Sequence, residues 1–205
     1  MGTWSAPPET PLKGMRRCHR TDCTNGLHCF LKHRKRRSPE GTCIACGVDL
    51  VDWPRVHQRD LDDVAHTIEM LKMESVRHEF WCAVPLTERA TIYARRHGRM
   101  GLLVAARKRI ASSVGKAAGA WDGRQTPWED KANVLQYAQH ATATCCRKCL
   151  EVWHGIPRGE ALSARDAEYF AQLLLRFVEF RIPDLGNERQ RIPRKAGQRS
   201  LKKAS

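Results

Sequence analysis

The chain has 205 residues, with 36 Lys and Arg against 22 Asp and Glu, and a formal net charge of +14. Hydrophobic residues make up 41% of it, enough for a buried core, but no stretch approaches the roughly 18 uninterrupted apolar residues of a membrane-spanning helix, which excludes a helical membrane protein. The first residues, MGTWSAPPETPLKGMRRC, have no apolar segment typical of a secretory signal, so we expect a cytoplasmic protein.

Four segments follow one another along the chain. Residues 1–14 are rich in Pro, Gly and Thr and are predicted to be flexible. Residues 15–56 hold five of the nine cysteines and few large apolar groups, which predicts a small zinc-ribbon-like module that needs metal to fold. Residues 57–186 are predicted to form a helical domain with a second zinc site, and residues 187–205 a basic, disordered tail. The expected fold class is therefore mainly α.

The N-terminal cysteines can be grouped in two ways. Cys43-x2-Cys46-Gly is typical of a zinc knuckle, because Gly47 permits the tight turn that faces backbone amides toward the sulfurs. We prefer a four-cysteine site in which Cys23 and Cys29 complete this pair. Cys18 is the alternate for either of them.

The second grouping is a finger with the spacing Cys18-x4-Cys23-x5-Cys29-x3-His33. This spacing resembles three-cysteine, one-histidine fingers that bind single-stranded RNA, in which Phe30 would stack on a base. It leaves Cys43 and Cys46 without partners unless His57 and another group complete a second site. We favour the four-cysteine site because CxxCG is the more specific signal.

Positive charge is concentrated near the two ends of the sequence. Residues 12–37 carry nine Lys and Arg against one Asp, and residues 188–205 carry seven against one Glu, whereas residues 38–187 carry 20 against 19 Asp and Glu. Basic segments flanking a neutral body favour a nucleic-acid partner, DNA or RNA, although such ends can also serve solubility alone. The residues expected to contact phosphates are Lys32, Arg34, Lys35, Arg36 and Arg37.

Capping residues mark two helices within residues 57–186. Thr87 is predicted to cap a helix that ends at Gly98. Ser163, followed by Asp166 at the third helical position, predicts a capping box at the start of the last and most amphipathic helix.

The C-terminal cysteine group lies in the run HATATCCRKCLEVWH, residues 140–154. Two thiols and two imidazoles there give a Cys2His2 zinc set. Its members are His140, Cys146, Cys149 and His154, with Cys145 as the alternate for Cys146. An iron–sulfur cluster on the three cysteines, or three cysteines that are simply buried, are the competing interpretations. Together with the N-terminal site, this predicts two zinc ions.

Residues 121–185 resemble a bacterial and phage family known as domain of unknown function 4186. The resemblance depends on the run AQHATATCCRKCLEVWHGIPRG and on the helix that follows it. It implies that His140, the three cysteines, Trp153 and His154 belong to one motif, and that the N-terminal module is an added element. It implies no activity.

Three functions are compatible with these features. Four ligands close the coordination sphere of a structural zinc, which favours a non-catalytic zinc protein that binds nucleic acid through its basic termini. If one histidine does not bind the metal, a zinc-dependent hydrolase or nuclease becomes the alternative, with its site at His140–His154 and Glu151 as the general base. A phage or mobile-element accessory protein that binds another protein is the third interpretation.

Overall fold

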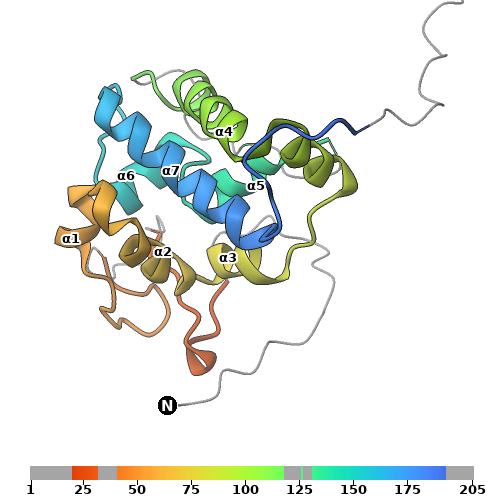
Figure 1. Ribbon diagram of the computed structural model, residues 1–205. Coiled ribbons are helices and arrows are strands. Elements are labelled where there is room, and N and C mark those ends of the chain that lie inside the picture. The colour runs from red at the N-terminus through yellow and green to blue at the C-terminus, as the bar shows by residue number, and fades with distance from the viewer. Residues whose placement is uncertain (1–19, 32–40, 118–125, 127–130, 193–205) are drawn as a thin grey trace, which may run out of the picture.

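The computed structural model of the protein describes residues 20–31, 41–117, 126 and 131–192. This part of the chain is mainly helical, which confirms the predicted fold class (Figure 1). Its α-helices are α1 (Trp53–Gln58), α2 (Val64–Lys72), α3 (Ser75–His78), α4 (Glu88–Ser113), α5 (Val134–Ala141), α6 (Arg147–His154) and α7 (Ala164–Arg181). Short 3-10 helices cover Cys23–Asn25 and Leu61–Asp63, and a π-helix covers Glu79–Ala83. No strand occurs among the described residues, where isolated bridges join Asp22 to Leu27 and His28 to Glu74.

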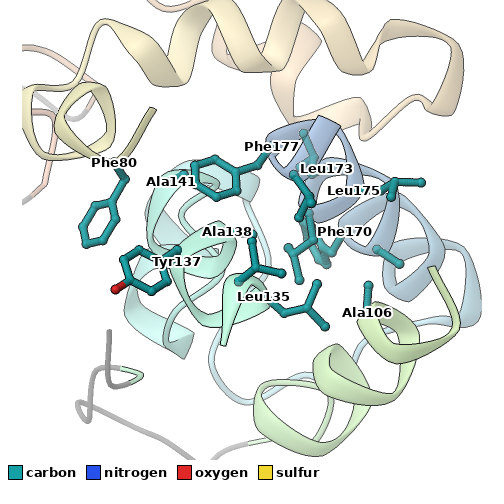
Figure 2. Packing of buried hydrophobic residues seen from close by; sticks show 14 of the residues in the cluster. Phe80, Ala106, Leu135, Tyr137, Ala138, Ala141, Phe170, Leu173, Leu175 and Phe177 are labelled. Atoms are coloured by element: carbon teal, nitrogen blue, oxygen red, sulfur yellow. The ribbon is translucent and has the colours of Figure 1, made fainter. Parts of the chain in front are cut away.

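The larger hydrophobic core lies between α4, α5 and α7 (Figure 2). Helix α7 contributes Phe170, Leu173 and Phe177, whose spacing of three and four residues places them on one face. This face meets Leu135 of α5 and Ala106 of α4, which are also buried. The amphipathic pattern predicted for the last helix thus forms the centre of the helical body.

Side-chain caps begin the helices that build this core. The backbone N–H of Ala90 donates to Thr87 Oγ1 at 3.2 Å, which confirms the predicted cap of α4. Ser163 and Asp166 form the predicted reciprocal capping box at the start of α7, with the N–H of Asp166 donating to Ser163 Oγ at 3.1 Å. Local sequence therefore fixes where these two helices begin.

Gly98 interrupts α4 with a non-helical backbone conformation, φ 62° and ψ 173°. A Cβ at this position would lie 2.4 Å from the carbonyl oxygen of Glu188. The two amides after the kink are paired with the chain that follows α7: Arg99 N–H donates to Gly186 O at 3.0 Å and Met100 N–H to Asn187 O at 3.3 Å. The predicted helix end at Gly98 is a kink from which the helix resumes.

The chain after α7 runs along α4 (Figure 1). The N–H of Gln190 donates to Arg95 O at 2.9 Å, and Arg96 Nη2 donates to Ile192 O at 3.0 Å. The first residues of the segment expected to form a basic tail therefore pack on the helical body, and residues 193–205 lie outside the described residues.

A second, smaller hydrophobic cluster joins the N-terminal segment to the helical body. Phe30 packs edge-on against Trp53 and against Trp153 of α6, each at a ring-centroid distance of 5.9 Å. Backbone hydrogen bonds reinforce the contact, because His28 donates to Met73 O and Ser75 donates to His28 O, both at 2.8 Å. The N-terminal segment thus lies against the turn between α2 and α3.

Candidate metal centres

Four side chains near the N-terminus converge on one point. The ligand atoms of Cys23, His28, Cys43 and Cys46 all lie within 4.8 Å of one another. The Sγ atoms of Cys23 and Cys43 are 3.8 Å apart, and Cys46 Sγ is 3.5 Å from His28 Nδ1. Tetrahedral zinc, with Zn–S bonds of about 2.3 Å and Zn–N bonds of about 2.0–2.1 Å, sets S–S edges of about 3.8 Å and S–N edges of about 3.5 Å. The donor set and both separations fit that ion.

Two tight turns present these ligands. Gly47 follows Cys46 with φ 75°, and its N–H donates to Cys43 O at 2.9 Å. In the first turn Gly26 has φ 74°, and its N–H donates to Cys23 O at 3.2 Å. Glycine is suited to both positions because its φ is positive there. The CxxCG pattern therefore forms the expected knuckle, and CTNGLH forms a second turn of the same kind.

Backbone amides stabilise negative charge on one of these sulfurs. Burial alone would raise the pKa of Cys43, but backbone donors at Cys29, Cys46 and Ala45 bring the pKa down to about 6. The Ala45 N–H lies 3.5 Å from Cys43 Sγ. Burial and hydrogen bonds to the neighbouring thiols instead raise the pKa of Cys23 to about 11. An adjacent cation would be needed to ionise that second thiol.

The group differs in one member from the set preferred on sequence. Cys23, Cys43 and Cys46 come together as expected, and the fourth ligand atom in the group belongs to His28. Cys29 is fully buried and belongs to the smaller hydrophobic cluster. Cys18 and His33 lie outside the described residues. The sequence signal for His28 was the Asn-Gly turn between it and Cys23, which mirrors the glycine turn of the CxxC pair.

The second group consists of three buried cysteines. Ligand atoms of Cys145, Cys146 and Cys149 lie within 4.8 Å of one another, and the Sγ atoms of Cys145 and Cys149 are 3.6 Å apart. Cys146 precedes the first residue of α6, and Cys149 lies in its first turn. Both alternates considered on sequence, Cys145 and Cys146, are therefore present in the group. The thiol spacing again suits a metal with sulfur ligands.

The two histidines of the predicted Cys2His2 set make other contacts. His140 Nε2 donates to the backbone carbonyl of Thr126, and His154 Nε2 donates to Thr142 O at 2.9 Å. A carbonyl can only accept, so each Nε2 carries its proton. Burial lowers the pKa of His140 to about 4 and that of His154 to about 3, which keeps both rings neutral at pH 7. Neither belongs to the group of converging ligand atoms.

A buried ion pair supports the cysteine group from one side. Glu74 and Arg77 are almost fully buried, and Arg77 Nε donates to Glu74 Oε2 at 3.0 Å. The guanidinium also donates to Cys149 Sγ at 3.2 Å and to His140 O at 2.7 Å. Glu74 accepts from Trp153 Nε1 at 2.8 Å. This network could not be read from the sequence, because its members come from distant segments.

The cysteines oppose one another's ionisation. The hydrogen bond with Cys145 and burial raise the pKa of the Cys146 thiol to about 11, while the hydrogen bond with Cys149 acts in the opposite direction. Three thiolates in a buried space require a compensating cation. Bound metal would supply most of that charge, and Arg77 supplies a further positive charge beside Cys149.

Of the remaining predicted site residues, Glu151 is described and belongs to neither group. Glu151, the conditional general base, is exposed on α6 and pairs with Arg158 at 3.0 Å. The basic run at residues 32–37 lies outside the described residues.

The fold and the two residue groups define a mainly helical protein in which one Cys/His group near the N-terminus and one cysteine group in the helical region could each hold a metal ion. The chain belongs to the family described as "Domain of unknown function (DUF4186)", whose model matches residues 65–179. The resemblance seen on sequence is confirmed, and the match begins well before residue 121. The first candidate metal centre precedes the matched region, and the second lies inside it. No solved structure matches the chain. Over the described residues, none of the helices has the length and apolarity needed to cross a membrane.

Proposed function

We propose that this is a non-catalytic zinc protein with two zinc ions, and that its basic terminal segments bind nucleic acid. The observation that carries the zinc assignment is the geometry at the first centre. There, one S–S and one S–N separation, 3.8 and 3.5 Å, equal the edges of a zinc tetrahedron. Four protein ligands close that centre, which is the arrangement of a structural zinc.

The second ion would be held by Cys145, Cys146 and Cys149. Zinc with three thiolates has a net charge of −1, which the guanidinium of Arg77 beside Cys149 would offset. The three side chains are buried, at 1, 4 and 3% exposure. Burial supports a structural role, because a hydrolytic zinc must admit water and substrate. Thiol ligands at both centres also fit a reducing, cytoplasmic location.

The hydrolase alternative has less support. Glu151 is exposed and ion-paired with Arg158, whereas the cysteines are buried. A general base must lie within hydrogen-bond reach of the water that it activates. Glu74, the buried carboxylate in the hydrogen-bond network of Arg77, already accepts hydrogen bonds from Arg77 and Trp153.

The distribution of positive charge along the chain supports nucleic-acid binding. In the helical body, arginines pair with carboxylates: Arg95 with Asp184, Arg107 with Glu168, and Arg55 with Asp63. Residues 38–187 are close to neutral in sum, so the excess of positive charge belongs to residues 12–37 and 188–205. Such segments would neutralise phosphates and release counterions.

Metal content tests the zinc assignment. We expect native mass spectrometry to find two zinc ions in the wild-type protein, one in His28→Ala and one in Cys149→Ser. Cys29→Ala is the matched control: it is adjacent to His28 and buried, but lies outside the ligand group, so it should retain both ions. Loss of an ion from Cys29→Ala but not from His28→Ala would instead support the four-cysteine site predicted from the sequence. A metal-free wild-type protein would refute the proposal.

Salt dependence tests the nucleic-acid assignment. Fluorescence anisotropy with labelled DNA and RNA should show affinity that falls steeply with salt. Substituting Lys32, Arg34, Lys35, Arg36 and Arg37 by Gln should make the log–log slope less steep by up to about 4. Binding that is insensitive to salt, or to these substitutions, would contradict the proposal. No binding to either nucleic acid would leave a protein partner as the better interpretation.

A further inference from the structure

A surface hollow of about 380 Å³ lies between α4 and the start of α5, and no cysteine is among its described lining residues. Its volume is within the range of about 300–1,000 Å³ that is common for small-ligand sites. The residues of its lining that matter here are Tyr93, His97, Val104, Lys108, Arg109 and Asn133. No acidic residue is among its described lining residues.

Arg109 gives the hollow a positive charge that the described residues do not neutralise. It is half-buried, with Nε donating to Gln139 Oε1 at 2.8 Å and Nη2 donating to Thr126 Oγ1 at 3.3 Å. Both partners are neutral. By contrast, Arg107 pairs with Glu168 through two hydrogen bonds of 2.5 and 2.9 Å. A guanidinium fixed by neutral groups keeps its full charge and is prepared to bind an anion.

The other side chains add a second cation and an aromatic wall. Lys108 is exposed and also lines the hollow. The rings of Tyr93 and His97 stack with centroids 4.2 Å apart and an angle of 29° between their planes. His97 Nδ1 donates to Tyr93 O at 2.8 Å, which fixes the imidazole orientation. Cations beside stacked aromatic rings match the two parts of a nucleotide, because phosphates pair with Arg and Lys while bases stack on aromatic faces.

We propose that this hollow binds one nucleotide unit, with its phosphate at Arg109 and Lys108 and its base against Tyr93 and His97. The unit is either a free mononucleotide or one residue of a single strand; the second form rests on the proposed nucleic-acid binding. In that form the hollow supplies a defined contact, and the basic termini add affinity that does not depend on sequence.

Two variants and a matched control test the site in the full-length protein. Val104→Trp would fill the hollow from an exposed apolar position, since Val104 is 48% exposed, and it leaves the charge unchanged. Lys108→Glu reverses a lining charge. Lys116→Glu makes the same charge change at an exposed position that is not part of the lining. Thermal unfolding and circular dichroism should be alike for all three variants.

The ligands are adenosine 5′-monophosphate and a fluorescein-labelled eight-nucleotide single strand, at one fixed salt concentration. We expect Val104→Trp and Lys108→Glu to weaken binding about tenfold, the effect of losing one stacked base or one close phosphate contact, and Lys116→Glu to bind like the wild type. Equal weakening by Lys108→Glu and Lys116→Glu, or no effect of Val104→Trp, would overturn the site.

The two proposals fail in different ways. If the single strand binds only through the basic run at residues 32–37 and the mononucleotide does not bind, the hollow is refuted and the proposed function stands. If the wild-type protein binds the mononucleotide, Val104→Trp weakens that binding and no single strand binds, the hollow stands as a small-molecule site. Nucleic-acid binding is then refuted. If neither ligand binds the wild-type protein, the hollow and the proposed nucleic-acid binding are both refuted.

Discussion

Arg77 donates a guanidinium N–H to the Sγ atom of Cys149 at 3.2 Å. The same guanidinium pairs with Glu74, whose other oxygen accepts the backbone N–H of Phe30 at 3.3 Å. One buried ion pair therefore links the N-terminal segment, the turn between α2 and α3, and the cysteine group at α6. Its energetic role follows from its burial, because neither charge can be solvated if its partner is removed.

Arg77→Met should destabilise the protein by about 3 kcal/mol or more, because it leaves the Glu74 carboxylate buried and unpaired. Glu74→Gln combined with Arg77→Met should be less destabilising than Arg77→Met alone, since the neutral amide can still accept from Trp153. Urea denaturation of the two single variants and the double variant measures this coupling. Additive losses would show that the pair does not act as a unit.

Gly98→Ala should destabilise the protein by about 1–3 kcal/mol, because its backbone conformation is accessible almost only to glycine. The added Cβ would also meet the Glu188 carbonyl and push the chain after α7 away from α4. Gly159→Ala is the control, since nothing lies within 4 Å of a Cβ there, and its effect should stay within about 0.5 kcal/mol. Thermal melts of both variants make the comparison, and similar losses would contradict the role assigned to Gly98.

Acid should destabilise the fold through His140 and His154. An unfolded histidine takes up a proton near pH 6.5, whereas burial holds the folded pKa values at about 4 and about 3. As the pH falls below about 6.5, the unfolded state binds protons that the folded state does not. The free energy of unfolding then falls by up to about 1.4 kcal/mol per pH unit for each histidine, until the folded values are reached.

His154→Gln keeps a donor for Thr142 O but removes a side chain that takes up a proton in the unfolded state. Its unfolding free energy, measured by urea titration between about pH 6.5 and 5, should therefore fall less steeply than that of the wild type. Loss of metal in acid affects both proteins, so the difference between their slopes isolates the histidine. Identical slopes would mean that His154 is not held neutral by the fold.

Removing metal should loosen the N-terminal segment more than the helical body. Phe30, Trp53 and Trp153 pack together next to the first centre, with the two indole rings 5.2 Å apart. A chelator should therefore shift tryptophan emission to the red while most of the helical circular dichroism remains. Trp53→Phe should show a smaller shift. Unchanged emission after both ions are lost would show that the metal does not hold this contact.

Local features of the fold were predictable from sequence, because their causes lie within a few residues. Thr87 and Ser163 cap their helices through side chains next to the amides that they satisfy. Gly47 forms the knuckle because it follows its own cysteine pair. The stripe that contains Phe170, Leu173 and Phe177 follows from the helical period.

Long-range features were not predictable, because the spacing of residues along the chain does not say which segment a side chain faces. His140 and His154 have suitable spacing for zinc ligands, yet each Nε2 donates to a backbone carbonyl supplied by another segment. His28 faces Cys46 across 18 positions, and nothing in the sequence connects Glu74 to Phe30 or Arg77 to Cys149. These contacts depend on how the N-terminal segment packs on α2, α3 and α6.

The packing around Trp153 shows that the core extends beyond the residues matched by the family model. The family match starts at residue 65, inside α2, yet the fully buried Trp153 is covered by Phe30 and Trp53, which precede that boundary. A polypeptide cut to the matched residues would expose this indole and the Glu74 carboxylate to water. In this chain, the matched residues alone are therefore not a complete folding unit, because residues before position 65 cover part of their core.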